Sequence, residues 1–211
     1  MNTLKIIIYT GYFILFVNNL LYFKSYRKNS IAFKILSFYL LFGLIIQFNS
    51  HYLSSLRENN LFLSHFFFIG QFLVLSIFYL KTFTSKVLKK TVFYGLILIV
   101  LILIINIFYT QEYFYKWNVF EILLTSIPLL IYSFVFFIRN IDSTNKNFIF
   151  FNSGFFLYLI CSTLLFSAGN LKSEIKNALW YFNAILYLAF QVLIFVDWYK
   201  NFRKNKSEIL K

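Results

Sequence analysis

The sequence predicts an all-α integral membrane protein, a bundle of seven helices. Three observations lead to this fold class: the composition, the apolar runs and the distribution of basic residues. Of the 211 residues, 60% are hydrophobic and only 13% are charged, and the mean hydropathy is positive. A soluble domain carries about 25% charged residues. So much apolar surface requires a bilayer as its solvent.

Seven apolar runs are long enough to cross a hydrocarbon core, which takes about 20 helical residues. They cover residues 5–23, 31–48, 61–81, 91–109, 118–138, 148–167 and 179–198. The gaps between them are short and polar, so we expect one membrane domain over residues 1–211, ending in a basic tail at 199–211. No small-residue cleavage site follows the first run, and the cluster "KSYRK" comes after it. We therefore expect this run to remain as the first helix rather than to be removed as a signal peptide.

Aromatic residues and the single proline support these boundaries. Trp117, Trp180 and Trp198 fall at predicted helix ends, where tryptophan is enriched at the membrane surface. Pro128 lies midway along the fifth run, where a proline kinks a helix and leaves a backbone carbonyl without its donor. Phe and Tyr are abundant throughout (31 and 16 residues). We attribute this to the codon usage of an AT-rich genome, so single aromatic residues carry little functional weight.

The basic residues set the expected orientation, because Lys and Arg accumulate on the cytoplasmic side. Only five of the 20 Lys and Arg residues lie on the side of the N-terminus: Lys5, Arg57, Lys116, Lys172 and Lys176. The N-terminus is therefore expected outside and the C-terminus in the cytoplasm of a bacterial inner membrane. This asymmetry accounts for the net charge of +13 without nucleic acid. Five residues of the basic side are expected to contact a partner protein or anionic lipid: Lys86, Lys89, Lys90, Arg203 and Lys204.

Polar residues inside the predicted helices recur with helical spacing, which identifies faces turned to the bundle interior. The second helix ends with Gln47, Ser50 and His51, and the third begins with Ser64, His65 and Gln71. The fifth presents Asn118, Glu121 and Thr125, and the sixth Asn152, Thr163 and Ser167. The seventh carries a stripe along its whole length: Trp180, Asn183, Tyr187, Gln191 and Trp198.

Most of these groups lie toward the outer leaflet, which predicts an outward-opening polar pocket. Its candidate residues are Gln47, His51, His65, Gln71, Glu121, Ser167, Asn183 and Gln191. The alternative is that these side chains only hydrogen-bond helices to one another, each pair contributing about 0.6 kcal/mol.

Two carboxylates have separate interpretations. Glu121 is the only acidic residue expected within the apolar depth, either as a snorkelling side chain beside Trp117 or as a group that titrates or binds a cation. Asp197 lies near Lys200, where we expect an exposed ion pair.

The two histidines, His51 and His65, lie at the outer ends of adjacent helices and are weak candidates for a metal or haem site. Haem bundles that move electrons across a membrane generally need a second histidine pair, which the inner side lacks, and a zinc site needs a third ligand. Retinal is excluded, because the middle of the seventh helix has Tyr187 and Gln191 where a Schiff-base lysine would be required. The lone Cys161 excludes an intrachain disulfide.

Three stretches resemble a group of small polytopic membrane proteins of AT-rich bacteria: "NNLFLSHFFFIGQFLVLSIFY", "NSGFFLYLICSTLLF" and "WYFNAILYLAFQVLIFVDWYK". They cover under half of the chain, and the resemblance implies a fold of about seven helices and no particular activity. It also implies that a carboxylate is common where Gln71 stands here.

The leading interpretation is a non-enzymatic sensor, receptor or regulatory subunit, because a pocket without a soluble output domain implies a partner. Two alternatives stay open. One is an effector that oligomerises into a pore, and the other is a haem- or metal-dependent membrane enzyme that uses His51, His65 and Glu121. No phosphate loop, serine elbow or paired carboxylates occur, so we lean against an enzyme. We expect no resident cofactor, and as partners the lipid bilayer and either another protein or further copies of the chain.

Overall fold

The computed structural model describes residues 3–109, 114–144, 146–168 and 175–203. Within these ranges the chain forms seven α-helices, all long and apolar enough to cross a membrane. They are α1 (Thr3–Ser25), α2 (Ile31–Ser55), α3 (Phe62–Thr82), α4 (Lys86–Tyr109), α5 (Val119–Asn140), α6 (Ile149–Ser167) and α7 (Ile175–Asp197). A short 3₁₀ turn follows α1 at Tyr26–Lys28, and a π-helical turn, Trp198–Phe202, follows α7. The predicted all-α fold is confirmed, as are seven helices of the length and composition that a membrane span requires.

Several helices extend beyond their predicted ends, and α2 and α4 do so by the largest margins. Helix α2 continues to Ser55, so His51 is helical rather than at the start of a loop. Helix α4 begins at Lys86, and Lys86, Lys89 and Lys90 therefore lie in its first turns rather than in the loop before it. Lysine is a good helix former, and its long side chain can reach the polar boundary from within a helix. Apolar runs alone therefore underestimate the helix length.

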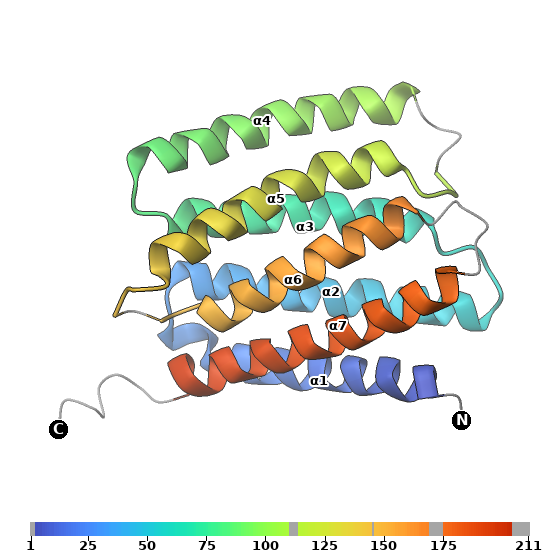
Figure 1. Ribbon diagram of the computed structural model, residues 1–211, viewed down its shortest axis with the longest axis horizontal. Helices are drawn as coiled ribbons and strands as arrows, with labels where there is room; N and C mark the ends of the chain where they lie inside the picture. The colour runs from blue at the N-terminus through green and yellow to red at the C-terminus, as the bar shows by residue number, and fades with distance from the viewer. Residues whose placement is uncertain (1–2, 110–113, 145, 169–174, 204–211) are drawn as a thin grey trace.

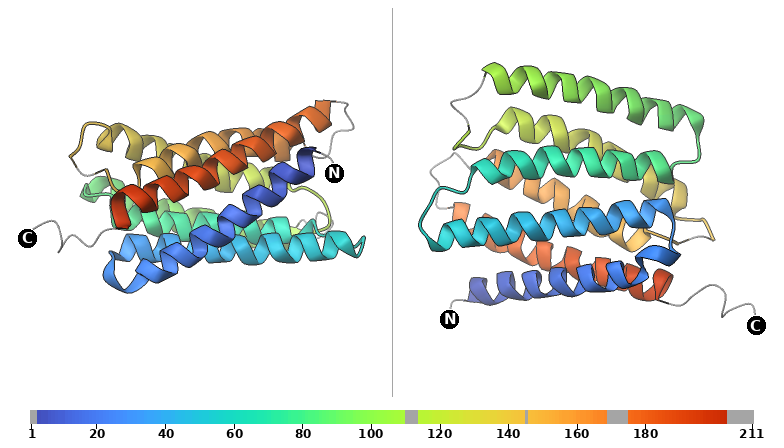
Figure 2. Two further views of the ribbon diagram at one scale, coloured as in Figure 1. Left: turned by 90° about the horizontal axis from the view of Figure 1, so that it is seen from below. Right: turned by 180° about the vertical axis from the view of Figure 1, so that it is seen from behind.

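Six of the helices form a closed ring. Neighbours pack in the order α1, α2, α3, α5, α6, α7 and back to α1, while α4 packs outside on α3 and α5. Figure 1 shows α4 at the edge of the bundle, and the left view of Figure 2 shows α1 crossing obliquely between α2 and α7. Helix α4 buries only Val92, Ile99 and Leu103, a narrow seam at helical spacing.

The two ends of the ring differ. At the C-terminal end, where α7 ends, the interior is filled by side chains with no exposed surface, among them Tyr22, Phe33, Phe78, Tyr79 and Phe151. The rings pack closely; the Tyr22 and Phe33 centroids, for example, lie 4.8 Å apart. At the N-terminal end, where α1 begins and α2 and α6 end, the interior is hollow. The ring is therefore a cup and not a tube.

Asp197 lies buried between α6 and α7 at the C-terminal end of the bundle. The prediction of an exposed ion pair with Lys200 is therefore wrong. Its side chain has 0% exposure, accepts a hydrogen bond of 2.8 Å from Asn201 Nδ2, and lies next to the backbone N–H groups of Phe148 and Phe150. The Lys200 ammonium lies over the Phe150 ring instead, 4.8 Å from its centroid. The first N–H groups of a helix lack partners within it and carry partial positive charge, so a carboxylate that faces α6 is stabilised there.

Gly154 allows α6 and α7 to approach closely. A Cβ atom there would lie 2.9 Å from Leu193 Cδ1 and 3.1 Å from Phe190 Cδ2, whereas nothing lies within 4 Å of a Cβ at Gly43. We expect Gly154→Ala to lower the free energy of unfolding by about 1–2 kcal/mol through overpacking. We expect Gly43→Ala to raise it by up to about 1 kcal/mol through helix propensity. Unfolding in mixed detergent–SDS micelles measures both; equal effects of the two substitutions would contradict close packing at Gly154.

Candidate functional site: a cavity in the helix ring

The hollow at the N-terminal end of the ring is a cavity of about 1000 Å³. Helices α1, α2, α3, α6 and α7 supply its walls, together with loop residues before α3 and α5. Because the loop residues Asn60, Leu61 and Trp117 belong to its lining, the cavity opens at this end of the bundle. Pockets for small molecules have volumes of about 300–1000 Å³, so this one is large enough for a drug-sized ligand.

The cavity lining is uncharged and mixes polar with aromatic groups. No Lys, Arg, His, Asp or Glu is among the described residues that line it. The polar amide and hydroxyl groups are those of Gln47, Ser50, Asn60, Ser64 and Asn183, and the larger aromatic rings are those of Tyr12, Trp117, Tyr158, Trp180 and Tyr187.

Of the eight residues predicted to form an outer pocket, the structure brings Gln47 and Asn183 to this cavity. The Asn183 Oδ1 atom is buried and accepts no hydrogen bond from the described residues. Ser167, near the end of α6, has a buried hydroxyl group that likewise finds no partner within the described ranges. Within the described ranges, neither of these two oxygen atoms makes the hydrogen bond between helices that the alternative interpretation requires.

Two other predicted residues hold helices together. The Gln71 Oε1 atom accepts a hydrogen bond of 2.9 Å from the Tyr39 hydroxyl group, which joins α3 to α2. The backbone carbonyl of Gln191 accepts one of 2.9 Å from Asn18 Nδ2, and its side-chain Oε1 lies 3.2 Å from the same atom, which joins α7 to α1. Both Gln71 and Gln191 are 2% exposed.

Three tyrosines form the floor of the cavity: Tyr12 of α1, Tyr158 of α6 and Tyr187 of α7. The ring centroids of Tyr12 and Tyr187 lie 6.3 Å apart, and those of Tyr158 and Tyr187 lie 5.7 Å apart. Below this tyrosine floor is a second, small cavity of about 20 Å³, which shares Tyr158, Tyr187 and Gln47 with the first. The floor therefore separates the open cup from the packed half of the ring.

The sequence reasoning placed Tyr187 on the polar stripe of the seventh helix but did not single out Tyr12 or Tyr158. Aromatic residues are so frequent in this chain that neither residue type nor local pattern distinguishes these two from the rest. The spacing of Tyr187 with Asn183 was the one usable signal, since residues four apart share a helix face.

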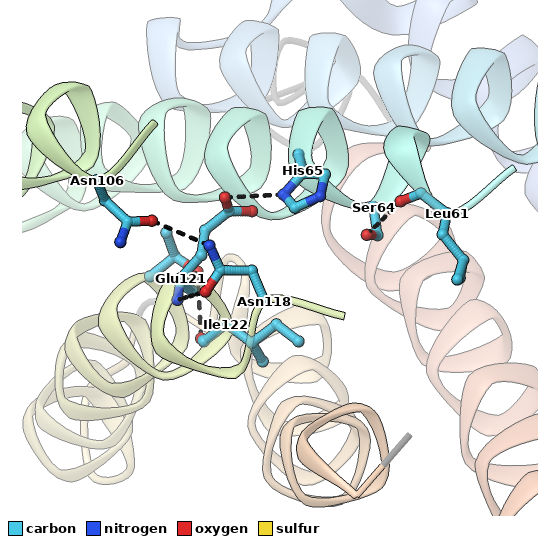
Figure 3. Close-up of polar contacts among 8 residues, drawn as sticks. Leu61, Ser64, His65, Asn106, Asn118, Glu121 and Ile122 are labelled. Carbon is cyan, nitrogen blue, oxygen red and sulfur yellow. Dashed lines mark hydrogen bonds and ion pairs between the residues drawn. The ribbon is translucent and has the colours of Figure 1, made fainter. Parts of the chain in front are cut away.

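His65 and Glu121 meet outside the cavity, between α3 and α5. Figure 3 shows the two side chains pointing toward one another, and His65 Nδ1 lies 2.9 Å from Glu121 Oε2. The imidazole stacks on Phe114, with the centroids 5.9 Å apart. The Glu121 residue is 2% exposed, so this is a buried pair.

Asparagines connect this pair to the peripheral helix. The Asn118 side chain caps α5 by accepting a hydrogen bond from the Glu121 backbone N–H, and its Nδ2 donates to Asn106 Oδ1 on α4 over 2.9 Å. Figure 3 shows these contacts side by side. The start of α5 is thus tied to both α3 and α4 by polar side chains.

His51 does not join His65 and Glu121. It lies on α2 against α1, where its ring meets Tyr9 and Tyr12 edge-on at 5.6 and 6.4 Å between centroids. Among the described residues, no group of three His, Cys, Asp or Glu side chains could hold a metal ion. The possible histidine ligands thus occupy two separate places.

The residues expected to contact a partner or lipid lie at the C-terminal end of the bundle. Lys86, Lys89 and Lys90 are exposed on the first turns of α4. The Arg203 guanidinium lies over the Tyr199 ring, 4.7 Å from its centroid. Lys204 falls outside the described residues.

No family model, no curated protein and no solved structure matches this chain. The resemblance to small polytopic membrane proteins of AT-rich bacteria therefore stays a prediction. The functional argument rests on the geometry of the cavity and of the groups around it.

Proposed function

We propose that this chain is a membrane receptor, either a sensor or a regulatory subunit, that binds a small molecule in the cavity of its helix ring. The single observation that carries the proposal is the cup of about 1000 Å³, open at one end and closed by fully buried aromatic side chains at the other. A cup of this kind suits binding better than conduction through a single chain. The described lining also lacks the His, Cys, Asp and Glu side chains that most enzyme sites use for acid–base or nucleophilic chemistry.

The proposal includes an orientation in a bacterial inner membrane. The described basic residues gather at the C-terminal end of the bundle, and only Lys5, Arg57, Lys116 and Lys176 of the described chain lie at the other end. Since basic residues stay in the cytoplasm, the cavity would open to the outside. A protein partner bound at the basic cytoplasmic end would then detect the ligand-bound state of the chain.

Native tryptophans provide the test of ligand binding. Trp117 and Trp180 line the cavity, whereas Trp198 lies at the other end, donating to Ser25 Oγ over 3.0 Å. In a Trp198→Phe background in lipid nanodiscs, a panel of small uncharged molecules should give at least one saturable change in fluorescence. Native mass spectrometry should count one such molecule per chain.

Filling the cavity gives the matched control. Ala184 is 8% exposed and lines the cavity, so Ala184→Phe should abolish the saturable signal. Leu98→Phe, on the exposed face of α4, should leave it unchanged. Equal signals from both variants would mean that the molecules dissolve in the bilayer, and the proposal would then fail.

The output side has its own test. Cross-linking in native membranes should capture a protein partner that is lost when Lys86, Lys89 and Lys90 are replaced by Gln. Replacing Lys24, Arg27 and Lys28 at the same end of the bundle removes the same charge and should retain the partner. A chain that stays monomeric and alone after cross-linking would contradict a regulatory subunit.

A further inference from the structure

The cavity has polarity that changes with depth, and this narrows the chemistry of its ligand. The mouth contains two indole rings, Trp117 and Trp180, and the walls include the apolar side chains of Leu4 and Ile8. The polar groups of this end bond within the protein: Asn60 Nδ2 donates to Ser50 Oγ over 2.8 Å, and Ser64 Oγ donates to the Leu61 carbonyl over 2.6 Å. Phenol groups gather at the floor. A ligand that fits this gradient has an apolar body toward the mouth and a polar head at the floor.

The phenol groups on the floor are available as hydrogen-bond donors. The rings of Tyr12 and Tyr158 both lie against the Tyr187 ring, with centroids 6.3 and 5.7 Å from it, and none of the three hydroxyl groups is hydrogen-bonded to the residues that the structure describes. The neighbouring Tyr39 differs, because its hydroxyl group donates to Gln71 Oε1. A phenol O–H readily donates to a carbonyl or ether oxygen, so three unused donors converge on one region.

One buried acceptor faces the same space. The Asn183 Oδ1 atom has no partner among the described residues, and Asn183 lines the cavity one helical turn from Tyr187. A buried polar atom without a partner costs free energy, which a ligand head that also carries a donor, such as a hydroxyl group, would recover.

The described lining of the cavity carries no charged side chain, and this limits the charge of the ligand. Transferring an ionised group into a site without a counter-charge is costly, and buried charges in proteins are paired. His65 and Glu121, which lie outside the cavity, already bind one another at 2.9 Å. Neither a carboxylate nor an ammonium head would find a partner of opposite charge among the described residues that line the cavity.

Resting on the proposed receptor function, we propose that the ligand is an uncharged amphipathic molecule whose hydrogen-bond-accepting head reaches the floor formed by Tyr12, Tyr158 and Tyr187. Its apolar body lies between the mouth tryptophans. Such a molecule is either a neutral lipid of the bilayer or a neutral solute from outside, and both share this chemistry.

Four probes that share a cyclohexyl and a phenyl group on one central carbon test the charge and the head group: cyclohexyl phenyl ketone, benzylcyclohexane, cyclohexyl(phenyl)acetate and cyclohexyl(phenyl)methylammonium. Native mass spectrometry of the full chain gives the affinity of each. The ketone should bind about 2–10-fold more tightly than the hydrocarbon, which is the value of one hydrogen bond. Both ions should bind more than about tenfold more weakly than the ketone.

Tyrosine variants locate the head. Tyr158→Phe and Tyr187→Phe should each reduce ketone binding about 2–10-fold and leave benzylcyclohexane unchanged. Tyr132→Phe is the control, since Tyr132 is a buried α5 tyrosine that is not part of the described lining. Tyr132→Phe should leave the binding of both probes unchanged. A thermal unfolding transition like that of the wild type shows that each variant is folded.

The outcomes separate the inference from the function on which it rests. Tighter binding of either ion, or equal loss of ketone and hydrocarbon in the tyrosine variants, would overturn the neutral-head inference and leave the receptor proposal standing. If none of the four probes binds saturably, both the inference and the receptor proposal are overturned.

The source of the ligand is a separate outcome. A neutral lipid that copurifies and blocks ketone binding until it is removed would support the inference with a lipid as the ligand. Ketone binding without such a lipid would support a solute, and a charged phospholipid in the cavity would overturn the inference.

Discussion

Replacing Glu121 by Ala is expected to lower the free energy of unfolding by about 3 kcal/mol. Its carboxyl group is buried, with Oε2 2.9 Å from His65 Nδ1, and a buried polar group that loses its hydrogen-bond partner costs about 1–3 kcal/mol, or more when it is charged. His65→Ala should have a similar effect, because the carboxylate then remains buried alone. Unfolding in mixed detergent–SDS micelles measures both losses.

A double-mutant cycle separates the pair from its surroundings. If the two side chains act on each other, the double variant should be less destabilised than the sum of the single variants, with a coupling of at least about 1 kcal/mol. Glu58→Ala is the matched control, since Glu58 is exposed in the loop before α3, and surface substitutions usually stay within about 0.5 kcal/mol. Additive effects at His65 and Glu121 would show that their contact contributes nothing.

Asn152→Leu is expected to cost about 2–4 kcal/mol, because Asn152 joins three helices within the packed half of the ring. Its Oδ1 accepts from the Tyr79 hydroxyl group on α3 over 2.8 Å and from Ser133 Oγ on α5 over 3.0 Å. Its Nδ2 donates to the Ser133 carbonyl over 2.9 Å. Each buried group left without a partner costs about 1–3 kcal/mol, and the same micelle unfolding assay measures the sum.

Asn49→Leu provides the comparison for Asn152. Asn49 is exposed on α2 and hydrogen-bonds only the Ile45 carbonyl of its own helix, so its loss should be neutral or stabilising in an apolar environment. Tyr79→Phe removes only one of the hydrogen bonds of Asn152, so it should lower the free energy of unfolding by less than Asn152→Leu does. A loss at Asn152 no larger than the loss at Asn49 would contradict its role as a link between helices.

Polar side chains in the helices illustrate how far the sequence reasoning reached. Helical spacing correctly placed Asn152 and Gln191 inside the bundle, where both are at most 2% exposed. It did not separate residues that join helices, such as Gln71, from residues that face the cavity, such as Asn183. Both kinds share a helix phase, and only the neighbouring helix decides whether a partner is within reach.

Asp197 shows the same limit from another side. Its position near Lys200 along the chain predicted an exposed ion pair. In the structure the Asp197 side chain is buried and lies next to backbone N–H groups at the start of α6. A helix end distant in sequence can compete with a neighbouring charge, and no local pattern reveals which contact forms.

By itself the sequence determined that the chain forms seven helices long and apolar enough to cross a membrane, because the length and the composition of each apolar run are local properties. Only the tertiary structure decided which six helices close into a ring and that α4 stays outside. It also paired His65 with Glu121 away from His51, and made Tyr12, Tyr158 and Tyr187 the floor of a cavity. These features depend on which helix faces meet, and in lipid that choice is made by close packing and by polar contacts between helices. Neither is encoded in a single stretch of the chain.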